Sequence, residues 1–182
     1  MTDNEGFKFI SGEYPRTLDD RFRVQIPQEL LVVLYKSLAV FGEASQEPDS
    51  SAKVECTLAK ERLGCVSLWH RQAWHKKLDE DLKVIGGKVD SRRLEGRFEQ
   101  VQLLGRLLST RAEDVELAAS TSSGARLLIP KRFREFLGVE PNSAVMVVAA
   151  AYSVELWNPA AWNEYLDAAI PDFHKVLDNL AQ

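Results

Sequence analysis

Three arginines and one aspartate lie close together near the start of a chain whose formal net charge is −4. Arg16, Arg21 and Arg23 fall within eight residues, and Asp19 stands four residues before Arg23. A guanidinium group is a planar fork that donates two hydrogen bonds at once, which suits phosphate groups and the edges of guanine bases. Asp19 would hold Arg23 through a charge-assisted hydrogen bond. From the spacing alone, the alternative stays open that this is an exposed ion pair, which closes a turn and contributes about 0–1 kcal/mol.

A second group of cations occurs in the other half of the chain, at Arg126, Lys131, Arg132 and Arg134. Arg126 belongs to a predicted strand, whereas the other three lie at the start of a predicted helix. Free backbone N–H groups at a helix start also attract anions, so these cations could take part in phosphate binding. The competing interpretation is an ordinary solvated helix face.

Two short motifs occur twice in the chain, in the same order, and this internal repeat is its most informative feature. The first is a half-buried strand that ends in proline, a residue that suits the first turn of a following helix. The second is a strand that ends in tryptophan, with another tryptophan five residues later on an amphipathic helix. The copies of the first motif are 23–27 (RVQIP) and 126–130 (RLLIP), and those of the second are 66–69 (VSLW) and 154–157 (VELW).

The repeat predicts an α+β protein, mainly β, with two similar copies in tandem. We expect an N-terminal extension at 1–8, a first copy at 9–86, a linking helix at 87–111, a second copy at 112–170 and a helical tail at 171–182. The first copy holds an inserted polar, turn-rich loop at about 42–53. Gly86 and Gly87 are expected to break the chain between the units, before a helix of nearly 20 residues that spans 91–110.

Composition and motifs argue against several other classes of protein. No apolar run approaches the ~20 residues of a membrane helix, and the polar N-terminus lacks the apolar segment of a signal peptide, so we expect a cytoplasmic protein. Cys56 and Cys65 are expected to be small buried residues on neighbouring strands. His70 and His75 are five residues apart, a poor spacing for a metal pair on a helix. We therefore expect no enzyme, no catalytic residue, no metal, no cofactor and no small-molecule substrate.

This order of motifs resembles the MraZ family, whose members join two domains of the SpoVT/AbrB type. The resemblance covers roughly residues 9–170 and is specific as an ensemble. In the first copy it is carried by Gly12, Leu18, Asp19, Arg23, Ile26 and Pro27, and in the second by Gly124, Arg126, Ile129, Pro130, Leu137, Gly138, Glu155, Leu156, Trp157 and Trp162. It implies two swapped-hairpin β-barrel halves, flanked by helices, that complete one barrel.

The resemblance also implies a function. Family members form ring-like homo-oligomers, bind promoter DNA with short repeats through their Asp-x-x-x-Arg faces, and regulate cell-division and cell-wall genes, so a location at the nucleoid is expected. The DNA-binding residues would then be Arg21, Arg23, Arg16 and Arg126.

The match has departures at both turns. Phe22 stands where the family has a turn glycine, and Ser122 stands where the second copy should have its aspartate. Asp19 and Ser122 would be the residues that orient the two turns.

Two other functions remain open on the sequence. One is an oligomeric scaffold or partner-binding module with weakened DNA binding, which the net negative charge and the incomplete second motif would allow. The other is an antitoxin that acts through its tail, 170–182, although such antitoxins are usually short and carry a single copy.

Overall fold

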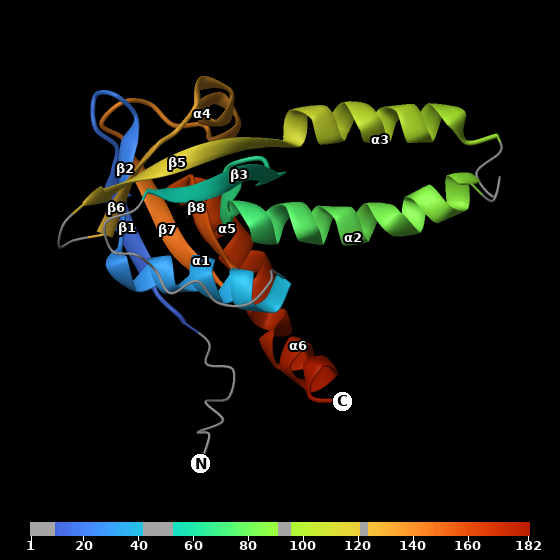
Figure 1. Cartoon of the computed structure of the whole chain (residues 1–182). Helices are drawn as coiled ribbons and strands as arrows, with labels where there is room; N and C mark the ends of the chain where they lie inside the picture. The colour runs from blue at the N-terminus through green and yellow to red at the C-terminus, as the bar shows by residue number, and fades with distance from the viewer. Residues whose placement is uncertain (1–9, 42–52, 91–95, 121–123) are drawn as a thin grey trace, which may run out of the picture.

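The computed structural model describes residues 10–41, 53–90, 96–120 and 124–182 (Figure 1). The strands, in chain order, are β1 Glu13–Thr17, β2 Arg23–Ile26, β3 Val54–Arg62, β4 Cys65–His70, β5 Ala112–Ser120, β6 Gly124–Leu128, β7 Ala144–Ala150 and β8 Ser153–Trp157. The helices are α1 Gln28–Phe41, α2 Arg71–Asp90, α3 Phe98–Arg111, α4 Lys131–Leu137, α5 Pro159–Ala169 and α6 Phe173–Leu180, with a 3₁₀ turn Ile170–Asp172 before α6.

All eight strands belong to one antiparallel sheet in the order β1-β7-β8-β4-β3-β5-β6-β2. The order interleaves the two sequence copies, because β1 pairs with β7, β3 with β5, β4 with β8 and β2 with β6. Neither copy can therefore pair all of its strands without the other. The expected α+β, mainly β fold of swapped hairpins is confirmed.

The pairing register shows that the two copies are related by an approximate two-fold axis. Val24 lies opposite Leu127 in the β2–β6 ladder, and the repeated motif makes these two residues equivalent. Ser67 lies opposite Glu155 in the β4–β8 ladder, and these are likewise equivalent. An antiparallel pair of equivalent residues is the local signature of a two-fold axis. Because the axis passes through both ladders, the sequence repeat is also a spatial repeat.

The sheet curves until its two edge strands, β1 and β2, meet at the turn that joins them. The amide of Asp19 donates to the carbonyl of Arg23 at 3.0 Å across this turn, and the amide of Leu18 donates to Ser143 at 2.9 Å. The interior is filled by fully buried side chains of both copies, including Ile26, Leu30, Leu58, Leu127, Ile129, Phe133 and Leu156. The nearly closed sheet thus holds one shared core.

The tryptophans pack where helices meet the sheet. Trp69 and Trp74 have ring centroids 6.0 Å apart, and Trp157 and Trp162 have centroids 5.1 Å apart. Each pair anchors the helix that follows a repeated strand, α2 in the first copy and α5 in the second. Cys56 and Cys65 are buried thiols without a disulfide, on the paired strands β3 and β4, which agrees with the prediction of small buried residues on neighbouring strands.

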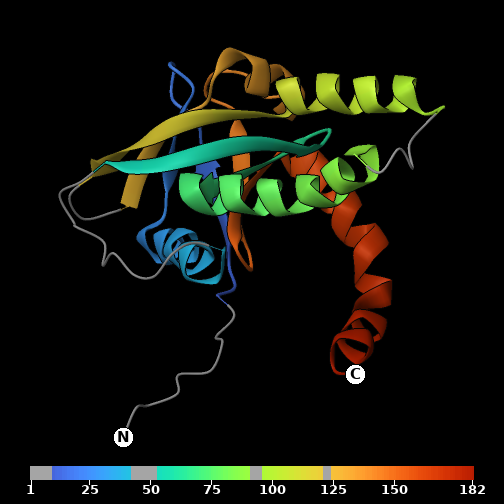
Figure 2. The ribbon, with the colours of Figure 1, turned by 45° about the vertical axis from the view of Figure 1, so that its right-hand side comes forward.

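The link between the copies differs from the sequence prediction. Helix α2 continues through Gly86 and Gly87 to Asp90, so the predicted break at these glycines is wrong. Helix α3 begins only at Phe98, after Gly96 adopts the left-handed backbone with φ +82°. Residues 91–95 lie outside the described part. The two helices extend away from the sheet beside each other, as the two views in Figures 1 and 2 show.

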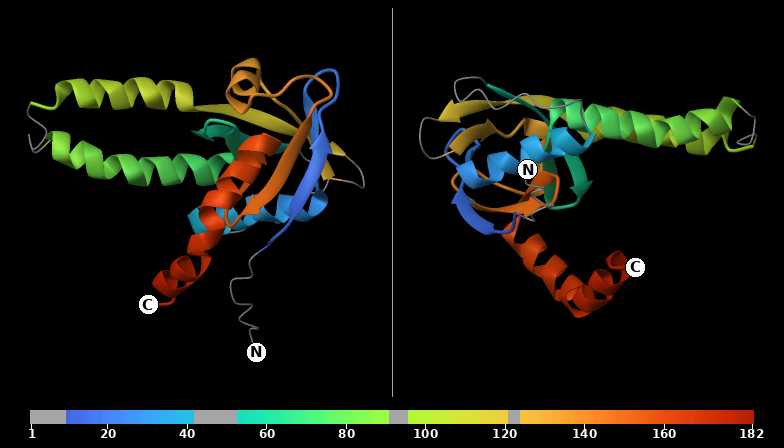
Figure 3. Two further views of the ribbon diagram at one scale, coloured as in Figure 1. Left: turned by 180° about the vertical axis from the view of Figure 1, so that it is seen from behind. Right: turned by 60° about the horizontal axis from the view of Figure 1, so that its bottom comes forward.

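Helices α3 and α6 leave apolar side chains uncovered, and neither has a buried residue. On α3, the side chains of Phe98, Leu103 and Leu107 are 71%, 52% and 56% exposed. Helix α6 carries Phe173, Val176, Leu177 and Leu180 at helical spacing, all exposed, and projects from the sheet on its own (Figure 3). Exposed apolar stripes of this kind are typical of surfaces that contact another molecule.

Candidate functional site

The turn between β1 and β2 is organised around the carboxylate of Asp19. Its Oδ1 accepts hydrogen bonds from the backbone amides of Arg21 at 2.9 Å and Arg23 at 2.8 Å. Its Oδ2 accepts from Nε of Arg23 at 2.6 Å, so the expected ion pair is present. The hydrogen bond from the backbone amide of Arg23 is the main reason that the pKa of Asp19 lies below its usual value. The carboxylate therefore stays ionised and fixes both the turn backbone and the Arg23 side chain.

Arg21 projects from this turn as an exposed cation. Its backbone is fixed by Asp19, whereas its guanidinium makes no hydrogen bond or ion pair with any other described residue. An arginine that has no carboxylate partner, in an acidic protein, can bind an external anion without first breaking an ion pair. The aspartate thus presents Arg21 while neutralising Arg23.

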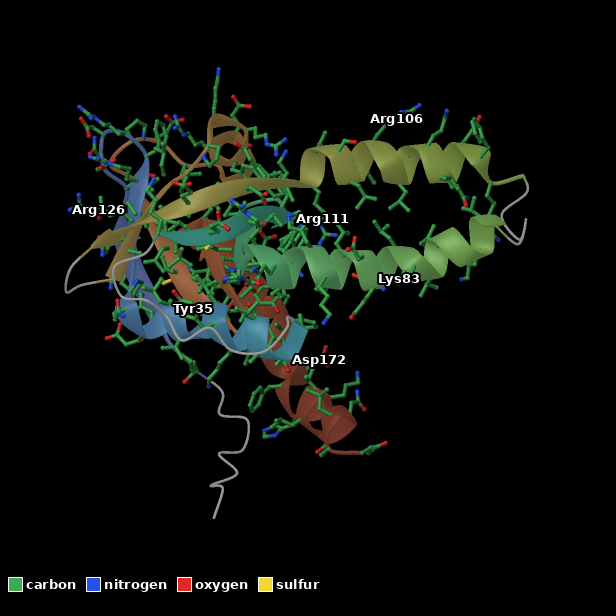
Figure 4. The ribbon with its side chains drawn as sticks, viewed as in Figure 1. Tyr35, Lys83, Arg106, Arg111, Arg126 and Asp172 are labelled. Atoms are coloured by element: carbon green, nitrogen blue, oxygen red, sulfur yellow. The ribbon has the colours of Figure 1, made fainter. Side chains whose placement is uncertain are left out.

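Arg23 and Arg126 lie on the same outer face, next to the two-fold axis. They are equivalent in the repeat, and the ladder sets Arg126 directly opposite Gln25, two residues along β2 from Arg23. Alternate residues of a strand share a face, and both arginines line a hollow of about 350 Å³ together with Thr17 and Gln25. Arg126 is exposed on β6 and makes no side-chain ion pair or hydrogen bond within the described chain (Figure 4).

Arg16 is separated from this group. Its guanidinium lies 5.6 Å from the centroid of the Tyr14 ring and donates to the carbonyl of Pro15 at 2.9 Å. Tyr14 packs against the core, so the side chain of Arg16 belongs to the opposite face of β1 from Thr17. Three of the four predicted DNA-binding arginines are therefore near the turn and its outer face, and Arg16 is not among them.

The second hairpin does not reproduce the turn of the first. Arg126, the counterpart of Arg23, pairs with Ala118, and the β5–β6 ladder continues to Ser120 opposite Gly124. In the first hairpin the carbonyl of Arg23 accepts from the amide of Asp19 at 3.0 Å at the turn itself, whereas strand pairing in the second hairpin continues two residues beyond Arg126. Ser122 lies outside the described residues. The two copies are thus equivalent in their core but different at the turn.

The second cationic group is divided by the fold. Nε of Arg132 forms an ion pair with Glu113 at 2.6 Å and its Nη2 donates to the carbonyl of Ala112. Arg134 points elsewhere, toward the β1–β2 turn, where its guanidinium lies 4.0 Å from the centroid of the Phe22 ring. The sequence predicted both arginines as cations at the start of a helix. Only the fold shows that Arg132 is neutralised and that Arg134 adjoins the turn of the first copy.

Among the described residues, no helix is both long enough and apolar enough to span a bilayer. Across residues 10–41, 53–90, 96–120 and 124–182, no three His, Cys, Asp or Glu side chains gather in a way that could hold a metal ion.

Comparison with known proteins supports the sequence resemblance. A family model described as "MraZ protein, putative antitoxin-like" matches residues 123–181. The chain is 24% identical to the transcriptional regulator MraZ of Treponema denticola over 174 residues, which cover 95% of this chain and 98% of that protein. It is 29% identical to the MraZ regulator of Marinobacter nauticus over 59% of this chain and 61% of that one. The regulator of the same name from Syntrophomonas wolfei is 22% identical, over 93% of this chain and 94% of that protein.

The three relatives carry one name, and two of them align along nearly the whole chain at low identity. The fold also interleaves the two sequence copies in the way that the resemblance implies. These findings are consistent with a divergent member of the MraZ family.

Proposed function

We propose that the protein is a sequence-specific DNA-binding transcriptional regulator that acts as a homo-oligomer. The observation that carries the proposal is Arg21: an exposed guanidinium without a partner among the described residues, on a turn whose backbone Asp19 holds rigid. The names of the relatives, transcriptional regulator MraZ, support the same function. By the family resemblance, the target is a promoter with short repeats that precedes cell-division and cell-wall genes, and the protein would act at the nucleoid.

One copy of the turn offers too few cations for tight binding, because specific DNA sites usually need several phosphate contacts. Repetition of the turn around an oligomer would supply them, since the second and later contacts benefit from a high effective concentration. The exposed apolar faces of α3 and α6 offer surfaces through which copies of the chain could associate. This arrangement allows a protein with a net charge of −4 to bind DNA locally.

The test is a salt titration of binding to the DNA upstream of the protein's own gene, with a scrambled duplex for comparison. Arg21→Ala should weaken binding and flatten the dependence of log K on log salt, because each lost phosphate contact lowers the slope by about 0.9. Arg106→Ala is the matched control, since Arg106 lies on α3, away from the turn (Figure 4), and the substitution removes the same charge. Equal slopes for both variants would contradict the proposal for Arg21.

A scaffold or partner-binding module is the second candidate, favoured by the uncovered apolar faces of α3 and α6. Light scattering separates the two candidates when it is combined with the titration. Assembly together with no preference for the upstream DNA over the scrambled duplex would favour the scaffold.

A further inference from the structure

Phe22 has a backbone conformation that suits glycine rather than an aromatic residue. Its φ is +60°, in the left-handed region that residues with a Cβ rarely adopt. Strain of this kind persists only where the surroundings fix it, and it often coincides with functional sites. The amide of Phe22 donates to Asp19 at 3.1 Å and its carbonyl accepts from the amide of Ile129 at 3.1 Å, so both sides of the residue are tied down.

The ring of Phe22 lies against the guanidinium of Arg134, 4.0 Å from its centroid, the shortest of the cation–π distances measured among the described residues. Nε of Arg134 also donates to the carbonyl of Ile129 at 2.6 Å. The guanidinium is therefore held on one face by the ring and along one edge by a carbonyl. Its two Nη groups make no hydrogen bond or ion pair within the described chain.

The surroundings of Arg134 leave its charge available. It lines an open hollow of about 560 Å³ together with Phe22 and Lys131. Glu135 and Glu140 also line this hollow, but neither forms an ion pair with Arg134. Arg132, two residues away on the same helix, is by contrast neutralised by Glu113 at 2.6 Å. Helix α4 thus carries Arg132, whose charge is neutralised by an ion pair, and Arg134, which is held in place without an ion pair.

The two elements concerned come from different copies. Figure 1 shows α4 beside the β1–β2 turn at one end of the sheet, and Figures 2 and 3 show the same arrangement from other sides. Arg21 and Phe22 are consecutive in the turn, so Phe22 holds its cation against the same turn that carries the proposed DNA contact. A duplex that reaches Arg21 would bring its phosphate backbone near Arg134 and Lys131.

We propose that Phe22 is a positioning residue that holds Arg134 of the second copy as a DNA phosphate contact beside Arg21 of the first copy. The inference rests on the proposed function. It gives a role to the aromatic side chain that occupies the turn in place of a glycine. It also makes the binding surface a joint product of both copies, because the first copy supplies the ring and the second supplies the cation.

The experiment measures the binding of the full-length protein to the upstream duplex by fluorescence anisotropy over a range of KCl concentrations. Arg134→Gln should make the slope of log K against log salt shallower by about 0.9 for each bound protomer. One lost phosphate contact of this kind corresponds to roughly eightfold weaker binding at 0.1 M salt. Arg132→Gln removes the same charge from the same helix, but from a neutralised ion pair, and should leave the slope unchanged.

Phe22→Leu removes the ring and keeps the charge of Arg134. It should weaken binding by about threefold to tenfold with an unchanged slope, because a loosely held side chain must be ordered when it binds. Phe22→Tyr keeps an aromatic ring and should behave as the wild type. In an Arg134→Gln background, Phe22→Leu should have no further effect, since no cation remains to be positioned.

The outcomes separate this inference from the proposed function. If the wild type does not prefer the upstream duplex, both fail. If the wild type binds and Arg134→Gln retains its slope, only the role of Arg134 fails. If Phe22→Leu weakens binding equally with and without Arg134, Phe22 does not act through Arg134. If Arg134→Gln does not fold, the comparison of Phe22→Leu with Phe22→Tyr decides, and equal affinities would overturn the proposal.

Discussion

Gly124, the first residue of β6, offers the sharpest test of how the two copies join. Its φ is +111°, and a Cβ at this position would lie 1.9 Å from the carbonyl oxygen of Ile26 and 2.9 Å from the amide nitrogen of Gln28. Both atoms are backbone, at the junction of β2 and α1 in the other copy. No side-chain rotation can relieve such a contact, so Gly124→Ala must move one backbone away from the other.

The cost can be worked out from two contributions. Forcing alanine into this part of φ/ψ space costs about 1–3 kcal/mol. Inserting a methyl group where the packing has no room costs about another 1–3 kcal/mol. The free energy of unfolding should therefore fall by about 2–6 kcal/mol. At roughly 2–4 °C per kcal/mol for a chain of this size, Tm should fall by about 4–24 °C.

Thermal and urea unfolding would be followed by far-UV circular dichroism at one fixed protein concentration, because self-association makes Tm depend on concentration. Gly105→Ala is the control. Gly105 lies within α3 with nothing within 4 Å of the added Cβ, so this substitution should raise stability by about 0.5–1 kcal/mol. A stability for Gly124→Ala within about 0.5 kcal/mol of the wild type would show that the backbones do not approach as described.

Three further predictions follow from the ionisable groups. The folded pKa of Asp19 is lowered, chiefly by the hydrogen bond that its carboxylate accepts from the backbone amide of Arg23, so its contribution to stability should persist above about pH 4 and be lost as the pH falls through that lowered value. The difference in unfolding free energy between wild type and Asp19→Asn should shrink only in that acidic range, and a constant difference would contradict this. Burial lowers the pKa of His70, so this side chain is protonated at a higher pH in the unfolded chain than in the folded protein, and stability should decline as the pH drops below about 6.5. The unfolding free energy of His70→Gln, measured by urea titration, should lack that decline. Burial raises the pKa of Cys56 to about 12 and raises that of Cys65 as well; an aromatic disulfide reagent at pH 8 should react with neither thiol until the protein is unfolded, and rapid native-state labelling would refute their burial.

The structural repeat could be predicted because it depends on local patterns. The motif that ends at Pro27 and Pro130 specifies a strand followed by a helix, and the tryptophan pairs specify a strand anchored to a helix. Asp19 and Arg23 could be predicted as a pair since their spacing alone lets a turn bring them together. The register through Val24 and Leu127 was not predictable, because strand pairing joins residues that are distant in the sequence.

The helical link was mispredicted at Gly86 and Gly87, and the reason is energetic. A glycine inside a helix costs roughly 1 kcal/mol, a small penalty that the rest of a 20-residue helix can offset. The described part of the link instead has its left-handed backbone at Gly96, with φ +82°. The glycines that matter are those with unusual dihedral angles, and the sequence does not show which these are.

The amino-acid sequence by itself determined the two copies, their strand and helix types and the charged turn at Asp19, since these follow from short-range patterns of polarity and backbone preference. Only the tertiary structure decided which arginines share a surface. Arg16 turns away from Arg23 because Thr17, its neighbour in β1, faces the hollow that Arg23 lines, and neighbouring residues of a strand face opposite sides. Arg134 meets Phe22, more than a hundred residues earlier in the chain, because interleaved strands bring the second copy's helix to the first copy's turn.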